Sequence, residues 1–81
     1  MESTSELRAR QLAQSLDCLA EEDLCILADV EPTTAENWRK RGKGPAYVLF
    51  GNRFLYPRKA VAEFLERRVR ERRDVPVKAL L

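Results

Sequence analysis

The stretch NWRKRGKGPAYVLFGNRFLYP, residues Asn37 to Pro57, decides the fold. Its first seven positions hold four basic residues, and glycine and proline follow, which favour a turn over further helix. Two β-prone runs then flank Gly51-Asn52, a two-residue connection typical of a β-hairpin. The stretch therefore predicts a helix that ends in a basic cluster and leads into a narrow hairpin.

The residues before this stretch predict two short helices joined by a tight turn. EEDLCILADV begins with three acids, which suit the positive N-terminal end of a helix. Asp29 to Pro32 leaves room only for a turn, and Pro32 suits the first turn of the next helix, which should run to about Arg41 and stop at Gly42. At helical spacing Ala35 and Trp38 share an apolar face, and Trp38 is expected in the core.

Two further helices should flank this unit. Ser3 and Glu6 have capping-box spacing before a helix over about Ser5 to Asp17. Its apolar stripe is Ala9, Leu12, Ala13 and Leu16, which we expect to pack on the chain's own core, with dimerisation as the alternative. Helical spacing resumes after Pro57, with an apolar stripe of Val61, Phe64, Leu65 and Val69.

The order helix, tight turn, helix, β-hairpin, helix is that of a winged helix-turn-helix. We therefore predict a mainly α fold with a small β-hairpin and an extra N-terminal helix. The expected parts are an N-terminal helix over 1–18, a winged helix-turn-helix domain over 19–73 and a flexible tail over 74–81.

Charge divides the chain into two unlike halves. Met1 to Pro32 has 2 basic residues against 8 acids, a net of −6, whereas Thr33 to Arg73 has 12 against 4, a net of +8. A basic half of this kind indicates a polyanionic partner on one side of the molecule.

Several classes of function are not expected. No segment approaches the length of a membrane span, and the polar start MESTSELRAR lacks the apolar region of a secretory signal, so we expect a cytoplasmic protein. With no histidine and only Cys18 and Cys25, we expect no metal site, no cofactor and no enzyme active site, and both thiols should behave as small buried apolar residues.

The residue types suit contact with duplex DNA. Short polar side chains on a recognition helix reach base edges, and the candidates here are Thr33, Glu36, Asn37 and Lys40. Candidates for phosphate contact are Arg39, Arg41, Lys43, Arg58 and Lys59. The wing tip is Gly51, Asn52 and Arg53, where arginine suits a minor groove.

Structural alternatives compete with these roles. Thr33 and Glu36 also have capping-box spacing, so Glu36 has equal claims to capping its own helix and to reading a base. Glu63 with Arg67 and Glu66 with Arg70 are spaced as ion pairs on a solvated face. The hairpin aromatics Tyr47, Phe50, Phe54 and Tyr56 more often pack within a hairpin than stack on bases.

One long stretch of the chain resembles the excisionase/MerR-type winged helix-turn-helix family of bacteria and their phages. This stretch is DLCILADVEPTTAENWRKRGKGPAYVLFGNRFLYPRKAVAEFLERR. The resemblance rests on the turn ending in Val30, the helix with Thr34 and Trp38, the RGKGPAYV entry to the wing, Gly51 and Tyr56, and a last helix with Val61 and Phe64. Asp29 stands where the family usually has glycine, and aspartate tolerates the left-handed conformation.

The resemblance implies a cofactor-free DNA-binding protein of the cytoplasm and nucleoid. It implies an excisionase-like recombination directionality or architectural factor, with a MerR-like transcriptional regulator as the alternative. An integrase or recombinase, or RNA polymerase, would then be a protein partner, with self-association on DNA. From the residues alone, a protein–protein interaction module is the rival class, with the acidic first helix and the tail as its surface.

Overall fold

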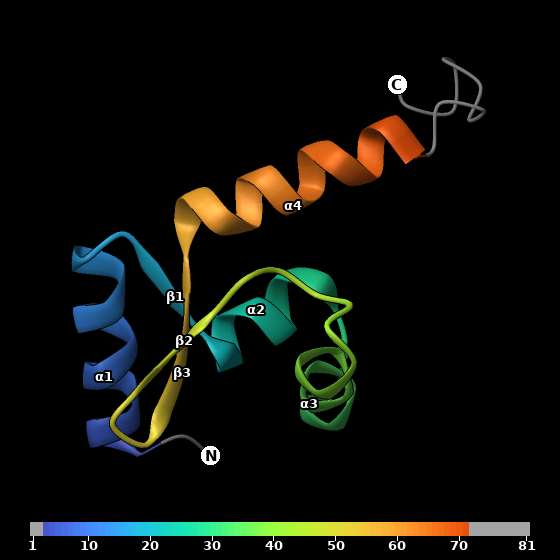
Figure 1. Cartoon of the computed structure of the whole chain (residues 1–81). Helices are drawn as coiled ribbons and strands as arrows, with labels where there is room; N and C mark the ends of the chain where they lie inside the picture. The colour runs from blue at the N-terminus through green and yellow to red at the C-terminus, as the bar shows by residue number, and fades with distance from the viewer. Residues whose placement is uncertain (1–2, 72–81) are drawn as a thin grey trace.

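The computed structural model describes residues 3–71, in which helices surround a small sheet (Figure 1). The elements in chain order are α1 (Thr4–Ser15), β1 (Cys18–Ala20), α2 (Glu21–Ala28), α3 (Pro32–Arg41), β2 (Val48–Phe50), β3 (Arg53–Pro57) and α4 (Arg58–Glu71). The predicted mainly α fold with a winged helix-turn-helix order is confirmed. The tail predicted over 74–81 lies outside the described residues.

The sheet is antiparallel and has the strand order β1-β3-β2. The hairpin pairs Leu49 with Phe54, as the Gly51-Asn52 connection predicted. The sequence did not predict β1, which places Leu19 opposite Tyr56. The boundary expected between residues 18 and 19 falls inside this strand, and the roles of the parts on either side stay predictions.

Left-handed residues end both helices of the helix-turn-helix. Asp29 follows α2 with φ 57° and ψ 52°, so the expectation that aspartate adopts this conformation is confirmed. The N–H of Val30 then donates to the Cys25 carbonyl at 3.0 Å, which ends the helix and turns the chain. Gly42 follows α3 with φ 64°, and the N–H of Lys43 donates to the Trp38 carbonyl at 2.9 Å.

The core lies where α2, α4 and β3 meet. Leu24, Tyr56 and Val61 form its buried centre, and Leu19, Trp38 and Phe54 pack against it partly buried. Trp38 therefore contributes to the core, although it keeps some exposure. The loop after α3 lies close to the Trp38 side chain. A methyl group on Gly44 would lie 3.1 Å from Trp38 Cβ.

Several apolar side chains that were expected in the core are exposed. Leu12 of α1 and Leu16 just after it are 49% and 69% exposed, so for these two leucines the expectation of packing on the chain's own core is wrong. Ala13 of the same predicted stripe is buried, and charged side chains on a neighbouring face of α1 make further contacts. Phe50 on the edge strand β2 is 71% exposed and does not pack within the hairpin.

The last helix projects from the body of the molecule (Figure 1). Val61, near its start, is buried, whereas Leu65 and Val69 are exposed. Only the beginning of the predicted apolar stripe of α4 thus packs on the core, because the helix leaves the sheet as it proceeds.

Candidate nucleic-acid interface

Helix α3 has one buried and one exposed face, as the spacing predicted. Ala35 is completely buried against the domain. Thr33 and Asn37 are exposed, and they lie on the helix face opposite Ala35. This face offers the short hydroxyl and amide groups that reach base edges.

Glu36 and Lys40 lie beside them as an ion pair within α3. Lys40 Nζ is 2.8 Å from Glu36 Oε2, and the hydrogen bond from Lys40 lowers the pKa of Glu36. The capping box does not form, because Glu31 is the N-cap residue and Thr33 already lies inside the helix. Glu36 is therefore free of a capping role and restrains Lys40 instead.

Arg39 points away from this face, into the domain. Its Nε donates to Glu21 Oε2 at 2.7 Å, and its guanidinium carbon lies 3.6 Å from the centroid of the Phe54 ring. The Tyr56 hydroxyl donates to the same Glu21 oxygen at 2.7 Å. The hydrogen bond with Glu21 raises the pKa of Arg39. Burial, and then Glu21, raises the pKa of Tyr56 well above its usual range. The phosphate contact of Arg39 stays a prediction beside this internal role.

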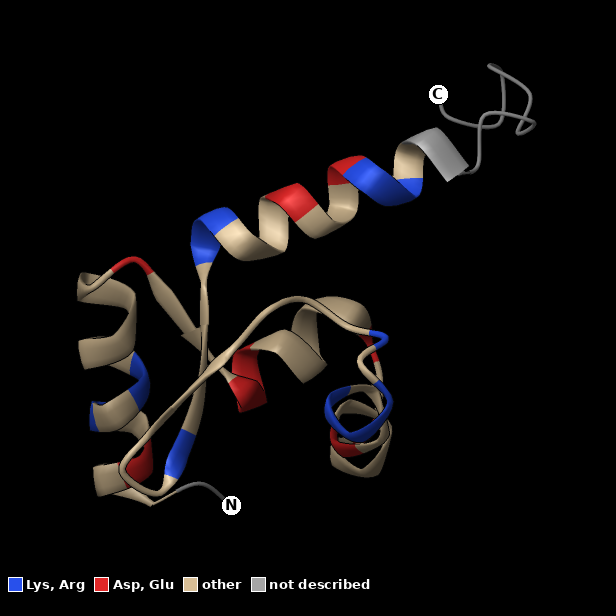
Figure 2. Cartoon of the chain, in the orientation of Figure 1, with Lys and Arg blue, Asp and Glu red and all other residues tan. Residues whose placement is uncertain are grey.

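Two groups of exposed cations are far apart on the molecule. Arg41 and Lys43 lie at the C-terminal end of α3, and within residues 3–71 neither forms an ion pair. Arg58 and Lys59 are likewise exposed, but they begin α4 at the end of β3 opposite to Arg53 (Figure 2). The structure thus places Arg41 and Lys43 beside the exposed face of α3 that carries Thr33 and Asn37. It places Arg58 and Lys59 away from the wing tip.

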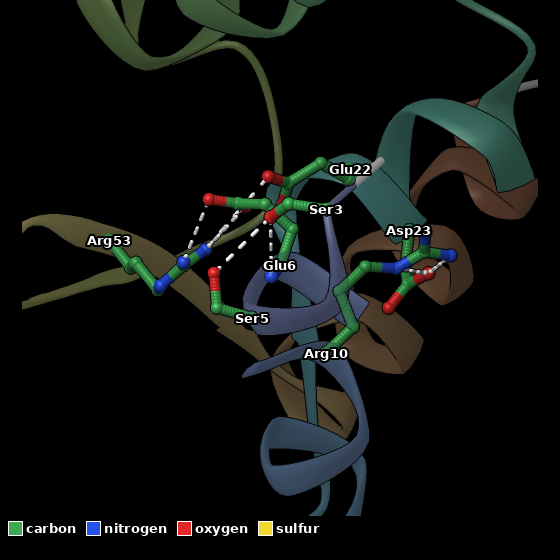
Figure 3. A network of polar contacts seen from close by, with 7 residues as sticks. All are labelled: Ser3, Ser5, Glu6, Arg10, Glu22, Asp23 and Arg53. Carbon is green, nitrogen blue, oxygen red and sulfur yellow. Dashed lines mark hydrogen bonds and ion pairs between the residues drawn. The ribbon is translucent and has the colours of Figure 1, made fainter. Parts of the chain in front are cut away.

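The arginine at the wing tip, Arg53, is already paired with acidic side chains of the same chain (Figure 3). Gly51 has φ 63°, and Asn52 is exposed. Both terminal nitrogens of Arg53 donate to the two carboxylate oxygens of Glu6 at 3.1 Å. Glu22 Oε2 lies 4.0 Å from Arg53 Nη1. Hydrogen bonding between the partners lowers the pKa of Glu6 and raises that of Arg53.

Sequence reasoning missed these acidic partners. It treated the −6 and +8 parts of the chain as separate surfaces, whereas Figure 2 shows the acidic start of α2 between the wing and α3. A hollow of about 830 Å³ lies there, lined among others by Glu6, Glu22, Pro32, Asn52 and Arg53. The reversal of charge along the chain was the available signal, since an acidic helix near a basic wing can form such pairs.

Three further observations concern metal ligands, thiols and membrane spans in the part of the chain that the structure describes. Within residues 3–71, no three acidic, cysteine or histidine side chains are grouped as metal ligands. Both cysteines are free thiols, Cys25 buried and Cys18 partly so, and burial raises the pKa of Cys25. None of the described helices has the length and apolar character needed to cross a membrane.

Comparison with protein families gives a match over more than half of the chain. Residues 22–69, which run from α2 into α4, match the family model described as a helix-turn-helix domain. Neither the curated proteins nor the solved structures yielded a match. The matched segment contains α3 and the wing, whereas α1 and β1 precede it.

Proposed function

The chain belongs to the helix-turn-helix domain family, and on this premise we propose that it binds duplex DNA sequence-specifically, with α3 in the major groove and the wing on the adjacent minor groove. Family membership supports DNA binding itself. The arrangement in the grooves is inferred from the side chains that α3 and the wing offer.

The two faces of α3 carry this proposal. Ala35 anchors the helix in the domain, while Thr33 and Asn37 are exposed on the opposite face. Asparagine can bond both N6 and N7 of adenine, and lysine can bond guanine. To read a base, Lys40 would leave its ion pair with Glu36 and bond to guanine. At a DNA site without guanine in this position the pair would be lost with no new bond in return, so such sites would be disfavoured.

Phosphate contacts would come first from the cations next to this face. Arg41 and Lys43 have no internal ion pair within residues 3–71, so binding DNA breaks no existing contact of theirs. Arg58 and Lys59 would join only if the duplex extended past the turn between α1 and β1, where Arg58 N–H donates to the Asp17 carbonyl at 2.8 Å.

A salt titration tests the binding. The association constant for a duplex should fall with salt at a slope of about −0.9 for each phosphate contacted. Footprinting on DNA from the chain's own genomic neighbourhood would then locate the site. Absence of salt-sensitive binding to any such duplex would favour the rival function, a protein–protein interaction module.

The biological role we propose is that of an excisionase-like architectural or directionality factor acting with an integrase or recombinase. A MerR-like regulator acting with RNA polymerase is the alternative, and a footprint beside a recombination site or over a promoter separates the two. We propose a free monomer that binds natural sites in several adjacent copies on the nucleoid. Sedimentation tests the monomer: a dimer lost in a folded Leu12→Asp/Leu16→Asp variant would show that these exposed leucines form an interface.

A further inference from the structure

Helix α1 is attached to the domain through charged side chains. Glu6 pairs with Arg53 of the wing, and Arg10 Nε donates to Asp23 Oδ1 of α2 at 2.9 Å (Figure 3). Ala13 is its buried residue, whereas its two leucines, Leu7 and Leu12, are each about half exposed, and Leu16 just after the helix is more exposed still. Ion pairs of this kind weaken when salt screens them or when a polyanion competes with the carboxylates for the two arginines.

Glu6 occupies Arg53 in the way that a phosphate would. Its two oxygens accept from both terminal nitrogens of the guanidinium, the fork geometry that arginine also uses with phosphate oxygens. A guanidinium has five N–H donors; Glu6 takes one from each terminal nitrogen of Arg53 and brings its negative charge to the tip of the wing. Phosphate and Glu6 therefore compete for the same two-nitrogen edge of Arg53.

We propose that α1 is a built-in competitor of DNA: Glu6 holds the wing arginine in the free protein, and duplex phosphates displace Glu6 when DNA binds. This inference rests on the proposed function, because it concerns the same wing. It assigns α1 an autoinhibitory role that lowers affinity for DNA.

The pair is suited to displacement. The side chains of Arg53 and Glu6 are 37% and 41% exposed, and ion pairs with that much solvent contribute little to stability. A duplex presents many phosphates and gains from counterion release when a cation contacts it.

Two variants of Glu6 test the proposal in the full chain. Glu6→Gln removes the competing charge, and Glu6→Asp keeps the net charge while shortening the side chain that reaches Arg53. Both should bind duplex DNA more tightly than the wild type. In the wild type the displaced Glu6 carboxylate takes up a cation and offsets one that the duplex releases, whereas Glu6→Gln has no such offset; the ratio of Glu6→Gln to wild-type association constants should therefore rise by up to roughly three- to fourfold as salt falls from about 200 to about 50 mM.

Two controls separate this effect from a general change of charge. Glu63→Gln makes the same change of net charge at an exposed position of α4 and should have a smaller effect. In an Arg53→Gln background, Glu6→Gln should no longer steepen the salt dependence. Equal tightening with and without Arg53 would overturn the proposal, as would weaker binding by a folded Glu6→Gln protein, which would mean that Glu6 positions Arg53 for DNA.

Retention on a heparin column keeps this test separate from that of the proposed function. Heparin is a polyanion without base sequence, so it reports on Arg53 even if no duplex site is found. Glu6→Gln should elute at higher salt than Glu63→Gln. Equal elution of these two variants would overturn the competition between Glu6 and a polyanion for Arg53, whereas failure of both the wild type and Glu6→Gln on every duplex would overturn the DNA-binding function and leave that competition standing.

Discussion

Arg39 of α3 and Glu21 of α2 form an ion pair of 2.7 Å that ties the recognition helix to the first helix of the motif. Their side chains are only 15% and 20% exposed. Because Glu21 also accepts from the Tyr56 hydroxyl, the pair links both helices to β3. The charge of Arg39 is thus used inside the domain.

Replacing Arg39 should therefore lower stability. Arg39→Ala leaves a partly buried carboxylate with one partner fewer and should cost about 1–3 kcal/mol of unfolding free energy, measured by urea denaturation. Arg41→Ala, its exposed neighbour, should stay within about 0.5 kcal/mol of the wild type and flatten the salt slope of DNA binding by about one unit. A stable Arg39→Ala protein with the flatter slope would instead make Arg39 a phosphate contact.

Asn37 should carry sequence discrimination. Asn37→Ala is expected to lose about 1–3 kcal/mol of binding free energy at the natural site and little on random duplex, because a base contact is made only at the correct base. Lys43→Ala is the matched comparison, with equal losses on both duplexes. Anisotropy titrations measure both, and equal losses for Asn37→Ala would reduce it to a backbone contact.

Trp38 and Gly44 should depend on each other. Trp38→Ala should cost about 3 kcal/mol, near the lower end of the range for large aromatic residues, because the indole is only partly buried. Gly44→Ala should cost about 1–3 kcal/mol, since its methyl group would lie 3.1 Å from Trp38 Cβ and 3.3 Å from Cε3 of the indole. In the Trp38→Ala background, which keeps Cβ and removes the ring, the Gly44→Ala penalty should shrink in part; an unchanged penalty would place the strain at Cβ or in the backbone.

Stability should fall at alkaline pH because of Tyr56. Its pKa is raised in the folded protein, so above the unfolded value of about 10 the unfolded chain releases a proton that the native state keeps. The contribution is complete below pH 10 and decreases by up to about 1.4 kcal/mol per pH unit above it. Tyr56→Phe should flatten this decline in urea denaturation, and a decline that is unchanged in this variant would contradict the prediction.

The parts of the fold with strong local signals were predictable. Gly42 and Pro32 bounded α3, and Gly51-Asn52 bounded the hairpin, because turn chemistry is read from a few adjacent residues. The strand β1 was not predictable, since three residues show no period and their pairing partner lies in β3, far along the chain. The exposure of Leu12 and Leu16 could not be predicted either, because an apolar stripe in the sequence does not show whether another surface of the protein packs against it.

The candidate site was predictable in composition but not in ion pairing. The exposed positions of Thr33 and Asn37 followed from the 3.6-residue period of a helix. Arg39 points inward because it pairs with Glu21, and Arg53 is paired with Glu6. Both acids are distant in sequence and are brought close only by the tertiary structure. The number of charges in each half of the chain carries no information about such pairs.

The pairing of β1 with β3 makes residues that precede the matched helix-turn-helix segment part of the domain's sheet. A fragment trimmed to begin at Glu21 would retain all of α2, α3 and the hairpin but would lose the strand that pairs with Leu55, Tyr56 and Pro57. Its β3 would then carry an open backbone edge, and a two-stranded hairpin by itself is marginal in water. During synthesis, likewise, β1 has no strand partner until the wing has left the ribosome, so the sheet can form only after most of the chain has been made.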